Sequence, residues 1–332
     1  MVHFIVFPNQ LYKDWRGLIK SDATVVLVEE PVYFCSFNVH KLRLAFMRAS
    51  MKSYFDNVLQ RGGWKGCKYI DAHRVDSYLQ GIKGSVQMLY PHDRRILDKY
   101  SRIFGKRIEV LQDPFAFVLE MDEVHALAKN MRTPSMRAVY GAVKKKLGVL
   151  VDVPSMDTMN RKQLSKGWVE DKRTVYKSKY YEEAVSYIDR LFKTNHGVMD
   201  QLAMLPIDHG SALRHLDVFL KQRFAKFGDF QDAMDVEGVI LYHGHISFLL
   251  NCGLLDVRDV VGAAMRMKSK VPMNSLEGFV RQLVGWREYM RYVYEIYYHD
   301  LARVFRGNGR LDASWYKGET GIMPLDIEIG KL

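Results

Sequence analysis

The chain has 332 residues, with 49 Lys or Arg against 38 Asp or Glu, so its formal net charge at pH 7 is +11. Hydrophobic residues make up 48% and aromatic residues 12%, which excludes a largely disordered chain and, at about 100–200 residues per domain, predicts two domains. No apolar run reaches the roughly 18 residues of a membrane-spanning helix, and the first residues read as a strand rather than a signal peptide.

The first part of the chain alternates strand and helix patterns. Thr24–Val28 is a continuous β-branched run, which is typical of a strand buried on both faces of a parallel sheet. Asn38–Gln60 repeats apolar residues at spacings of 3 and 4, which predicts a long amphipathic helix. Strands separated by helices predict a doubly wound, Rossmann-like parallel sheet. The other predicted elements are strands at Phe4–Phe7, Lys68–Ile70, Val86–Tyr90 and Arg107–Leu111, and a helix at Asp93–Phe104 that Gly105 ends.

The strand pattern stops near Ser135, and a basic region follows. Ser135–Leu147 predicts a helix with a cationic end, and the stretch from Gly148 to Lys179 is polar and irregular. Between Arg132 and Lys179, twelve Lys or Arg stand against four Asp or Glu, a local net charge of +8. This charge fits a surface that faces phosphates, and it fits a solvated linker equally well.

The rest of the chain predicts helices alone, so the expected fold class is an α/β domain followed by an all-α domain. We place the α/β domain at residues 1–132, the basic linker at 133–179 and the helical domain at 180–332. The predicted helices are Tyr180–Phe192, Asp208–Phe227, Ile246–Cys252, Asp256–Met267 and Asn274–Tyr298.

Several standard catalytic motifs are missing from the sequence. It holds no G-x-S-x-G, no Walker loop, no H-E-x-x-H and no G-x-G-x-x-G after the first strand. His243 and His245 are the nearest approach to a metal pair, but their spacing does not share a helical face and no carboxylate or cysteine nearby completes it. We interpret these histidines as structural or cofactor-facing and predict no metal site.

The three cysteines, Cys35, Cys67 and Cys252, are widely separated and form no C-x-x-C pair. This spacing predicts neither a disulfide framework nor the ligands of a zinc or iron–sulfur site. We expect reduced thiols in a cytoplasmic protein, or in a nuclear one if the host is a eukaryote. A basic protein of this kind usually meets a polyanion such as nucleic acid.

The last predicted helix sets aromatic rings among arginines between Gly285 and Tyr292. Flat side chains beside cations can stack a base or a flavin and neutralise phosphate. A helix–helix interface with Trp286 in the core would have the same composition. In this predicted helix, Phe279, Leu283, Trp286 and Met290 form one apolar stripe.

Several segments resemble the cryptochrome/photolyase superfamily. Gly278–Tyr289 is similar to the family helix E-G-F-x-R-Q-x-x-G-W-R-E-Y, and His40–Lys52 resembles its first long helix. Phe227–Met234 resembles F-G-x-[YF]-Q-D-A-M, Ser247–Leu255 resembles S-x-x-L-N-x-G-L-L, and Asp157–Lys162 resembles D-x-x-N-R-K. More narrowly, the chain resembles the bacterial iron–sulfur cryptochrome branch, the deoxyribodipyrimidine photolyase-related or prokaryotic (6-4) photolyase type.

The resemblance implies an antenna domain, a crossover and a helical domain that holds FAD. It also implies a DNA photolyase, a carbon–carbon lyase. In that reaction excited, reduced FAD donates an electron to a pyrimidine dimer or (6-4) photoproduct, the bond between the damaged bases breaks, and the electron returns. A lesion leaves the base stack at low cost, so it can be held against aromatic faces while Lys and Arg bind the phosphates. Damaged DNA is the implied partner, and a membrane is not.

The resemblance also assigns site residues. The catalytic residues between flavin and lesion are Gln282, Trp286 and Arg287. In other photolyases a glutamate stands in place of Gln282, so an amide would here bond the lesion. The residues expected near FAD are Gln231, Asp232, His243, Ser247 and Asn251. For Gln231 and Asp232, a purely structural role is an equally open alternative. Expected nucleic-acid contacts are Lys144, Lys145, Lys146, Arg161, Lys162 and Arg281. A ribityllumazine antenna, where one is bound, would contact Gln10, Leu11 and Glu29.

Tyr316–Asp326 resembles the family's approach to its next FAD-binding helix, and the sequence ends at Leu332 as that helix begins. Relatives continue with helices that close the flavin site and carry the four cysteines of an iron–sulfur cluster. The resemblance therefore implies a C-terminally truncated chain with an incomplete FAD site and no cluster. It would be a fragment, half of a split enzyme completed in trans by a second chain, or a degenerate relative.

Three functions are open at this point. The first is a photolyase-related flavoprotein that repairs DNA. The second is a cryptochrome-like blue-light sensor, in which flavin photochemistry changes partner binding. The third is a catalytically inactive, basic nucleic-acid-binding remnant.

Overall fold

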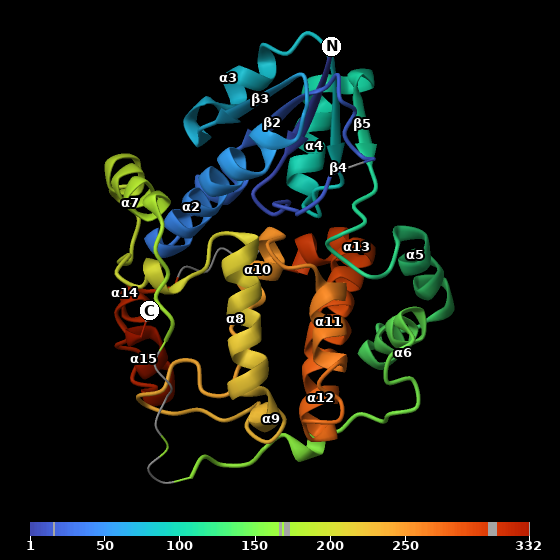
Figure 1. Cartoon of the computed structure of the whole chain (residues 1–332), viewed down its shortest axis with the longest axis vertical. Helices are drawn as coiled ribbons and strands as arrows, with labels where there is room; N and C mark the ends of the chain where they lie inside the picture. The colour runs from blue at the N-terminus through green and yellow to red at the C-terminus, as the bar shows by residue number, and fades with distance from the viewer. Residues whose placement is uncertain (16, 166–167, 169–172, 305–310, 332) are drawn as a thin grey trace. The chain divides into compact units, whose positions relative to one another are not determined.

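A computed structural model describes residues 1–15, 17–165, 168, 173–304 and 311–331. The chain forms two compact units, each built from separate stretches of sequence (Figure 1). Unit 1 comprises residues 1–116, 173–217 and 246–256, and unit 2 comprises residues 117–172, 218–245 and 257–332. The domain boundaries expected at residues 132 and 179 divide the chain in another way and stay a prediction.

Unit 1 is built on a five-stranded parallel sheet with the strand order β3-β2-β1-β4-β5. The central strand pairs on both sides, so that His3 lies between Thr24 and Val86. Each predicted strand is confirmed to within two residues at either end, and the predicted fold class, a parallel sheet followed by a helical region, is confirmed as well. The strands are β1 (Val2–Val6), β2 (Thr24–Val28), β3 (Gly66–Ile70), β4 (Ser85–Leu89) and β5 (Ile108–Leu111).

Helices cover both faces of the sheet, because each parallel connection needs a crossover. On one face Ile5 belongs to a buried cluster that includes residues of α3 and α4. On the other face Phe4 packs edge-on against Trp15 with ring centroids 5.5 Å apart, and Trp15 in turn donates a hydrogen bond to Tyr54 of α2. The helices of this part are α1 (Pro31–Phe34), α2 (Lys41–Asn57), α3 (Val75–Gln80) and α4 (Arg94–Phe104).

The remaining helices of unit 1 are α7 (Lys179–Leu191), which lies along α2 (Figure 1), and α10 (Ser247–Cys252). Helix α8 (His209–Gln222) passes from unit 1 into unit 2. The helices of unit 2 are α5 (Met121–Asn130), α6 (Met136–Leu147), α9 (Phe224–Phe227), α11 (Val257–Met265), α12 (Met273–Val280), α13 (Arg287–Val304), α14 (Ala313–Lys317) and α15 (Met323–Gly330). Short 3-10 turns occupy Leu59–Arg61, Ala72–Arg74, Gly105–Arg107, Asp157–Met159 and Leu202–Met204.

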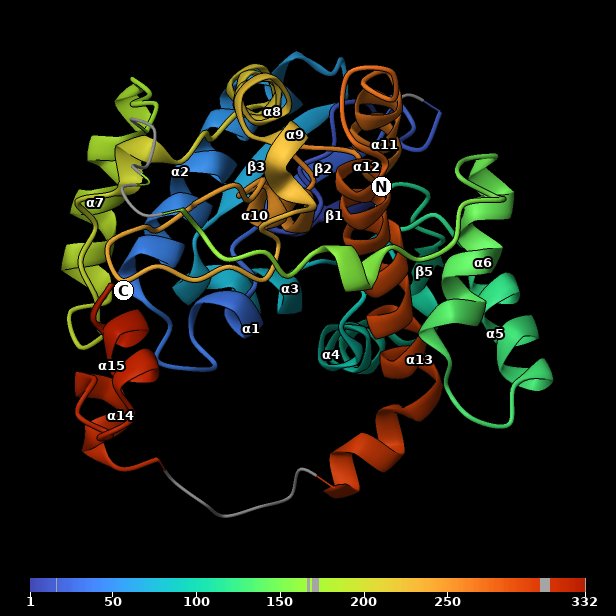
Figure 2. The same cartoon turned by 90° about the horizontal axis from the view of Figure 1, so that it is seen from below.

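Four phenylalanines form the aromatic centre of unit 2. Phe279 of α12 lies 4.9 Å from Phe219, 5.2 Å from Phe224 and 5.4 Å from Phe227, measured between ring centroids. Gly228 lets α9 approach α12 this closely, because a Cβ there would lie 2.4 Å from the backbone nitrogen of Ser275. Figure 2 shows α13 following α12 along one line, with α6 beside it.

Two predicted helices differ from the structure. Asp208–Phe227 is divided at Arg223 into α8 and α9, because Arg223 leaves the helical backbone region at φ −120°. Asn274–Tyr298 is interrupted by a π-helical turn at Arg281–Trp286. Helices α1, α3, α5, α14 and α15 were not predicted. The predicted irregular linker holds one 3-10 turn within its described residues, while its residues 166–167 and 169–172 lie outside them. Among described helices, none combines the length and the apolarity needed to cross a membrane.

Candidate functional site

The π-helical turn Arg281–Trp286 separates α12 from α13. Such a turn bonds residue i to i+5 and so contains an extra residue, which rotates the helix that follows by about 100°. Phe279, before the turn, and Leu283, within it, are 4% and 6% exposed, whereas Trp286 and Met290 are 41% and 59% exposed. The predicted apolar stripe is therefore wrong beyond Leu283, and so is the alternative that places Trp286 in the core.

The same rotation buries polar residues of α13. Glu288 is 1% exposed and accepts a hydrogen bond from the backbone N–H of Val118. Arg291 is 6% exposed, and its guanidinium lies 3.8 Å from the Glu288 carboxylate. Arg287 and Arg291 both lie over the ring of Phe117, at 4.9 and 4.5 Å from its centroid. The π turn thus brings a buried acid–base pair against residues 117–118.

Burial raises the pKa of Glu288, although the Val118 N–H and Arg291 favour its ionised form. The folded state then binds this proton more tightly than the unfolded chain. The free energy of unfolding should therefore fall as pH rises from the ordinary value of 4.5 through the folded pKa. We expect Glu288→Gln to flatten this fall, as measured by urea denaturation at a series of pH values.

Glu123 is the matched control. Burial opposes its ionisation, but the Glu120 N–H and Lys146 together lower its pKa. Its contribution to stability is present above pH 4.5 and lost as pH falls, so Glu123→Gln should change the profile in the opposite direction. Parallel profiles for wild type and Glu288→Gln would contradict the expectation.

The three predicted catalytic residues lie on the π turn or directly after it. Gln282 is half-buried, and its amide bonds to no residue in the described part of the chain. The Trp286 ring stands edge-on to Tyr289, with centroids 5.8 Å apart. Gln282 and Trp286 are four residues apart, so in a π turn they occupy neighbouring positions on one face. Arg287, the third residue, is held over Phe117.

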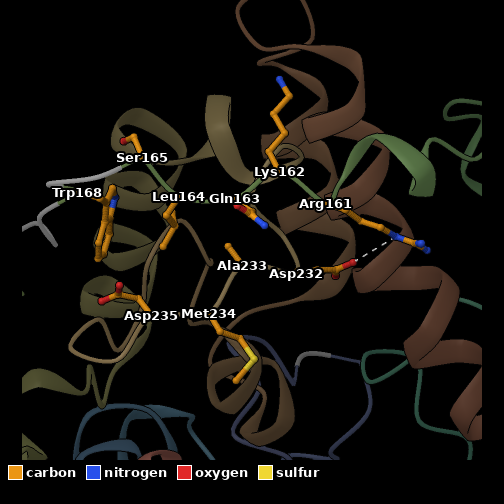
Figure 3. Close-up of a pocket in the computed structure, with 10 residues that line it drawn as sticks. All are labelled: Arg161, Lys162, Gln163, Leu164, Ser165, Trp168, Asp232, Ala233, Met234 and Asp235. Carbon is orange, nitrogen blue, oxygen red and sulfur yellow. Dashed lines mark ion pairs between the residues drawn. The ribbon is translucent and has the colours of Figure 1, made fainter. Parts of the chain in front are cut away.

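A second group of predicted residues lines a pocket of about 660 Å³ in unit 2 (Figure 3). The side chains of Arg161 and Asp232 point toward one another, with Nε 3.9 Å from Oδ2, while Lys162 extends away from the rest. The volume lies within the range of small-molecule sites. The lining residues are Arg161, Lys162, Gln163, Leu164, Ser165, Trp168, Asp232, Ala233, Met234 and Asp235.

Aromatic side chains support this pocket. Trp168 stands edge-on to Tyr242 at 6.0 Å, and Tyr242 stacks on Phe230 at 5.0 Å. Lys226 lies 5.5 Å from the centroid of the Tyr242 ring. Gly238 makes room for Trp168, since a Cβ there would lie 2.8 Å from the indole ring. The pocket therefore combines cations, carboxylates and one flat apolar wall.

The residues expected near FAD fall in both units. Gln231, Asp232 and His243 belong to unit 2, whereas Ser247 and Asn251, both exposed, lie on α10 of unit 1. The Gln231 amide lies 3.2 Å from that of Asn160, which is compatible with the structural role left open for it. Asp232 keeps a half-exposed carboxylate on the pocket wall.

His243 requires a correction. Its Nδ1 lies 2.9 Å from the carbonyl oxygen of Ile240, and its Nε2 lies 2.8 Å from that of Gln231. Both ring nitrogens thus face backbone carbonyl oxygens, so a cofactor or metal ion would have to displace one of these contacts to reach the ring. His243 holds the segment between residues 231 and 243 in place, in agreement with the structural half of its interpretation.

The antenna residues also differ from expectation. Glu29 is fully buried and accepts hydrogen bonds from the side chains of Arg48, Tyr69 and Tyr187 and from the backbone N–H of Ala72, so all four acceptor sites of its carboxylate are used within the protein. Leu11 is fully buried, and its N–H and C=O are bonded to Cys252 and His209. Gln10 alone keeps an unbonded acceptor, Oε1, which is buried while Nε2 donates to Tyr90.

The predicted nucleic-acid residues of α6 divide into three kinds. Lys144 donates to the carbonyl oxygen of Val153 at 2.9 Å, and Lys146 pairs with Glu123. Lys145 is exposed and lines a groove of about 500 Å³ together with an arginine that the sequence analysis missed, Arg137. The groove residues are Arg137, Tyr140, Gly141, Lys144, Lys145, Val151, Val153, Pro154 and Ser155. Arg137, Lys144 and Lys145 are spaced so that they share one helical face. This spacing was the signal in the sequence that could have identified the groove.

The other predicted nucleic-acid residues are Arg161, Lys162 and Arg281. Arg161 and Lys162 pair with Asp157 and Asp229, but their side chains are 65% and 63% exposed and so remain accessible. Arg281 is 3% exposed and paired with buried or half-buried carboxylates. The expectation that Arg281 contacts DNA is therefore wrong, because a phosphate cannot reach its guanidinium.

A protein-family model described as "deoxyribodipyrimidine photo-lyase-related protein" matches residues 4–203. The chain belongs to this family. A (6-4) photolyase of Agrobacterium fabrum is 27% identical to it over 330 residues, which cover 92% of this chain and 64% of the relative. The chain thus spans somewhat less than two thirds of the length of that curated relative.

Solved structures of photolyases and cryptochromes share the fold of this family member. A class III photolyase from Agrobacterium tumefaciens superposes with a TM-score of 0.59 at 12% identity, covering 98% of this chain and 67% of that one. A Synechocystis cryptochrome superposes with a TM-score of 0.58 at 14% identity, covering 98% and 69%. At sequence identities this low, the superpositions show a shared fold and nothing further.

Proposed function

We propose that this photolyase-related protein is a flavoprotein that takes part in light-driven repair of pyrimidine dimers or (6-4) photoproducts in DNA. The observation that carries the proposal is the π turn, which exposes Trp286 next to a Gln282 amide without a described partner. Binding of an extruded base requires an exposed aromatic face beside a free amide. The base stacks on the aromatic ring, and the amide forms hydrogen bonds with the edge of the base.

FAD is the cofactor that the family implies, and the donor set of the 660 Å³ pocket fits part of such a dinucleotide. Arg161 and Lys162 would bind phosphate oxygens, and Trp168 would cover a ring face. The carboxylates of Asp232 and Asp235 would accept hydrogen bonds from sugar hydroxyl groups. When bound, reduced FAD supplies a single electron after absorbing light. The part played by the chain's own residues is to bind, orient and shield this group.

The α6 groove supports an interface with the DNA backbone. Arg137, Lys144 and Lys145 line it, and no carboxylate does. Each phosphate neutralised on duplex DNA contributes about −0.9 to the slope of log K against log salt. We expect Arg137→Met/Lys145→Met to make that slope shallower by about 2, as measured by fluorescence anisotropy from low to moderate salt.

Lys146→Met is the matched control, since Lys146 lies on the same helix but is paired with Glu123. Its slope should stay close to that of the wild type. If the double variant kept the wild-type slope, or if the control lost as much, the α6 groove would not be the DNA interface.

The function as a whole is tested by loading the purified chain with FAD and illuminating it with damaged oligonucleotides. The expected results are flavin absorption that stays with the protein after gel filtration, and loss of the lesion only in the light. A colourless protein after loading would overturn the flavoprotein proposal. Retained flavin without lesion loss, together with light-dependent partner binding, would favour the cryptochrome-like sensor. DNA binding by a colourless protein would favour the inactive remnant.

A second polypeptide is proposed as a partner in this activity. The chain spans 64% of its Agrobacterium relative, and α14 and α15 expose large apolar side chains such as Tyr316 at 69% and Met323 at 71%. Helices that correspond to the rest of the relative would cover such side chains. Adding the C-terminal third of the Agrobacterium (6-4) photolyase in trans should raise flavin retention and repair; unchanged values would count against the partner.

A further inference from the structure

A buried ion-pair network joins the π turn to residues 156–160. Arg281, the first residue of the turn, places Nε 3.2 Å from Glu277 Oε1 and Nη1 2.9 Å from Asp157 Oδ1. Glu277 is fully buried and also accepts a hydrogen bond from the backbone N–H of Met156 at 3.1 Å. Arg281 therefore bonds to its own helix on one side and to a segment 124 residues away on the other.

Asn160 completes the network from the same segment. It is fully buried, and in the orientation that satisfies its neighbours its side-chain oxygen accepts from Arg281 Nη2 at 3.2 Å while its nitrogen donates to Gly228 O at 2.9 Å. Gly278 allows this approach, because a Cβ there would lie 2.9 Å from the Asn160 amide. The guanidinium of Arg281 is thus surrounded by acceptors from two segments of unit 2, Glu277 on its own helix and Asp157 and Asn160 on the other.

A π turn is seldom stable on helix propensity alone, and such turns persist where the surroundings hold them. The alternative for Arg281–Trp286 is a regular α-helix. Without the extra residue of the π turn, the helix that follows would be rotated back about its axis by about 100°. Trp286 would then rotate toward the buried face and Glu288 would leave it. The contacts at the start of the turn therefore bear on which side chains are exposed at its end.

We propose that Arg281 is a positioning residue, which clamps the π turn to residues 157–160 and so keeps Trp286 exposed beside the half-buried Gln282. What those two side chains bind rests on the proposed function, but the clamp does not. The guanidinium of Arg281 donates hydrogen bonds in several fixed directions. These directions match the positions of two carboxylates and one side-chain amide. A lysine provides the charge without that geometry.

The first test is fluorine NMR of the chain labelled with 5-fluorotryptophan, with the Trp286 signal assigned by Trp286→Phe. In Arg281→Lys and Asp157→Asn, the Trp286 signal should shift and lose its solvent isotope effect, as a ring does on burial. The signals of Trp15 and Trp64, which lie in unit 1, should stay in place.

Arg303→Lys serves as the control, because Arg303 also lies on this helical stretch but its side chain is 74% exposed. Its spectrum should equal that of the wild type. An unchanged Trp286 signal in Asp157→Asn, which keeps the size of the side chain and part of its hydrogen bonding, would overturn the proposal. So would a wild-type signal in Arg281→Lys.

The second test measures lesion discrimination, the ratio of affinities for damaged and undamaged DNA, in the FAD-loaded chain. If stacking on Trp286 is lost, this ratio should fall about tenfold in Arg281→Lys while the salt slope stays at its wild-type value. A shallower slope would instead mean a phosphate contact and overturn the clamp. If the wild type shows no discrimination, the proposed function fails, and the NMR result still decides the clamp.

Discussion

Replacing Arg48 by methionine is expected to lower the free energy of unfolding by about 3–5 kcal/mol, because it leaves a buried carboxylate without its cation. Arg48 lies on α2 and is 6% exposed. Its Nη1 is 2.8 Å from the carboxylate of Glu29, which is fully buried, and its Nη2 is 2.6 Å from that of Glu183 on α7. One side chain thus connects a strand end with two helices of unit 1.

The surrounding residues place the loss near the lower end of this range. Glu29 keeps neutral donors after the change, since Tyr69 and Tyr187 donate to it at 2.6 and 2.7 Å. Burial and the charge of Glu29 raise the pKa of both tyrosines, so they stay protonated as donors. Glu183 has a half-exposed side chain, and water can replace part of its ion pair.

Urea denaturation followed by circular dichroism measures the effect. Arg43→Met is the matched control, because Arg43 is an exposed arginine on the same helix, and its change should stay within about 0.5 kcal/mol. Glu29→Gln/Arg48→Met should recover part of the loss, because no buried charge is then left alone. Equal losses for Arg48→Met and Arg43→Met would show that the cluster does not stabilise unit 1.

The sheet of unit 1 could be predicted because its signals are local. Thr24–Val28 is β-branched at every position except Leu27 and proved to be β2, with the same bounds. Asp93 caps α4 by accepting from the Arg95 N–H, and Gly105 ends it at a φ of +53°. Helix α5 was missed although Glu120 and Glu123 form a capping box, since its apolar pattern is short.

The π turn could not be predicted, because its causes are distant in sequence. The apolar spacing through Trp286 fits an unbroken α-helix, and only partners such as Asp157 and Val118 decide otherwise. Arg281 and Glu29 were misassigned for the same reason: a charged residue in a family motif suggests a ligand, whereas these two are satisfied inside the protein. Local patterns specify elements, while buried polar networks depend on which segments meet.

Replacing Trp286 by alanine is expected to reduce affinity for damaged DNA about 10- to 100-fold, because base–aromatic stacking contributes roughly 1–3 kcal/mol per base. The indole is 41% exposed, and the Tyr289 ring packs nearly perpendicular to it with centroids 5.8 Å apart, so the indole is already available to an extruded base. Undamaged duplex offers no such base at low cost. Its affinity should change far less than that for DNA with a lesion.

Anisotropy titrations in the dark, with FAD-loaded chain and duplexes carrying one (6-4) photoproduct or none, separate stacking from charge. Trp286→Phe should keep most of the discrimination, since phenylalanine retains a face for stacking. Trp315→Ala is matched in exposure, at 40%, but lies on α14. If it weakened binding as much as Trp286→Ala, or if Trp286→Ala weakened both duplexes alike, the π turn would not hold the lesion. A loss confined to damaged DNA and to Trp286 would place recognition on the exposed face of the π turn.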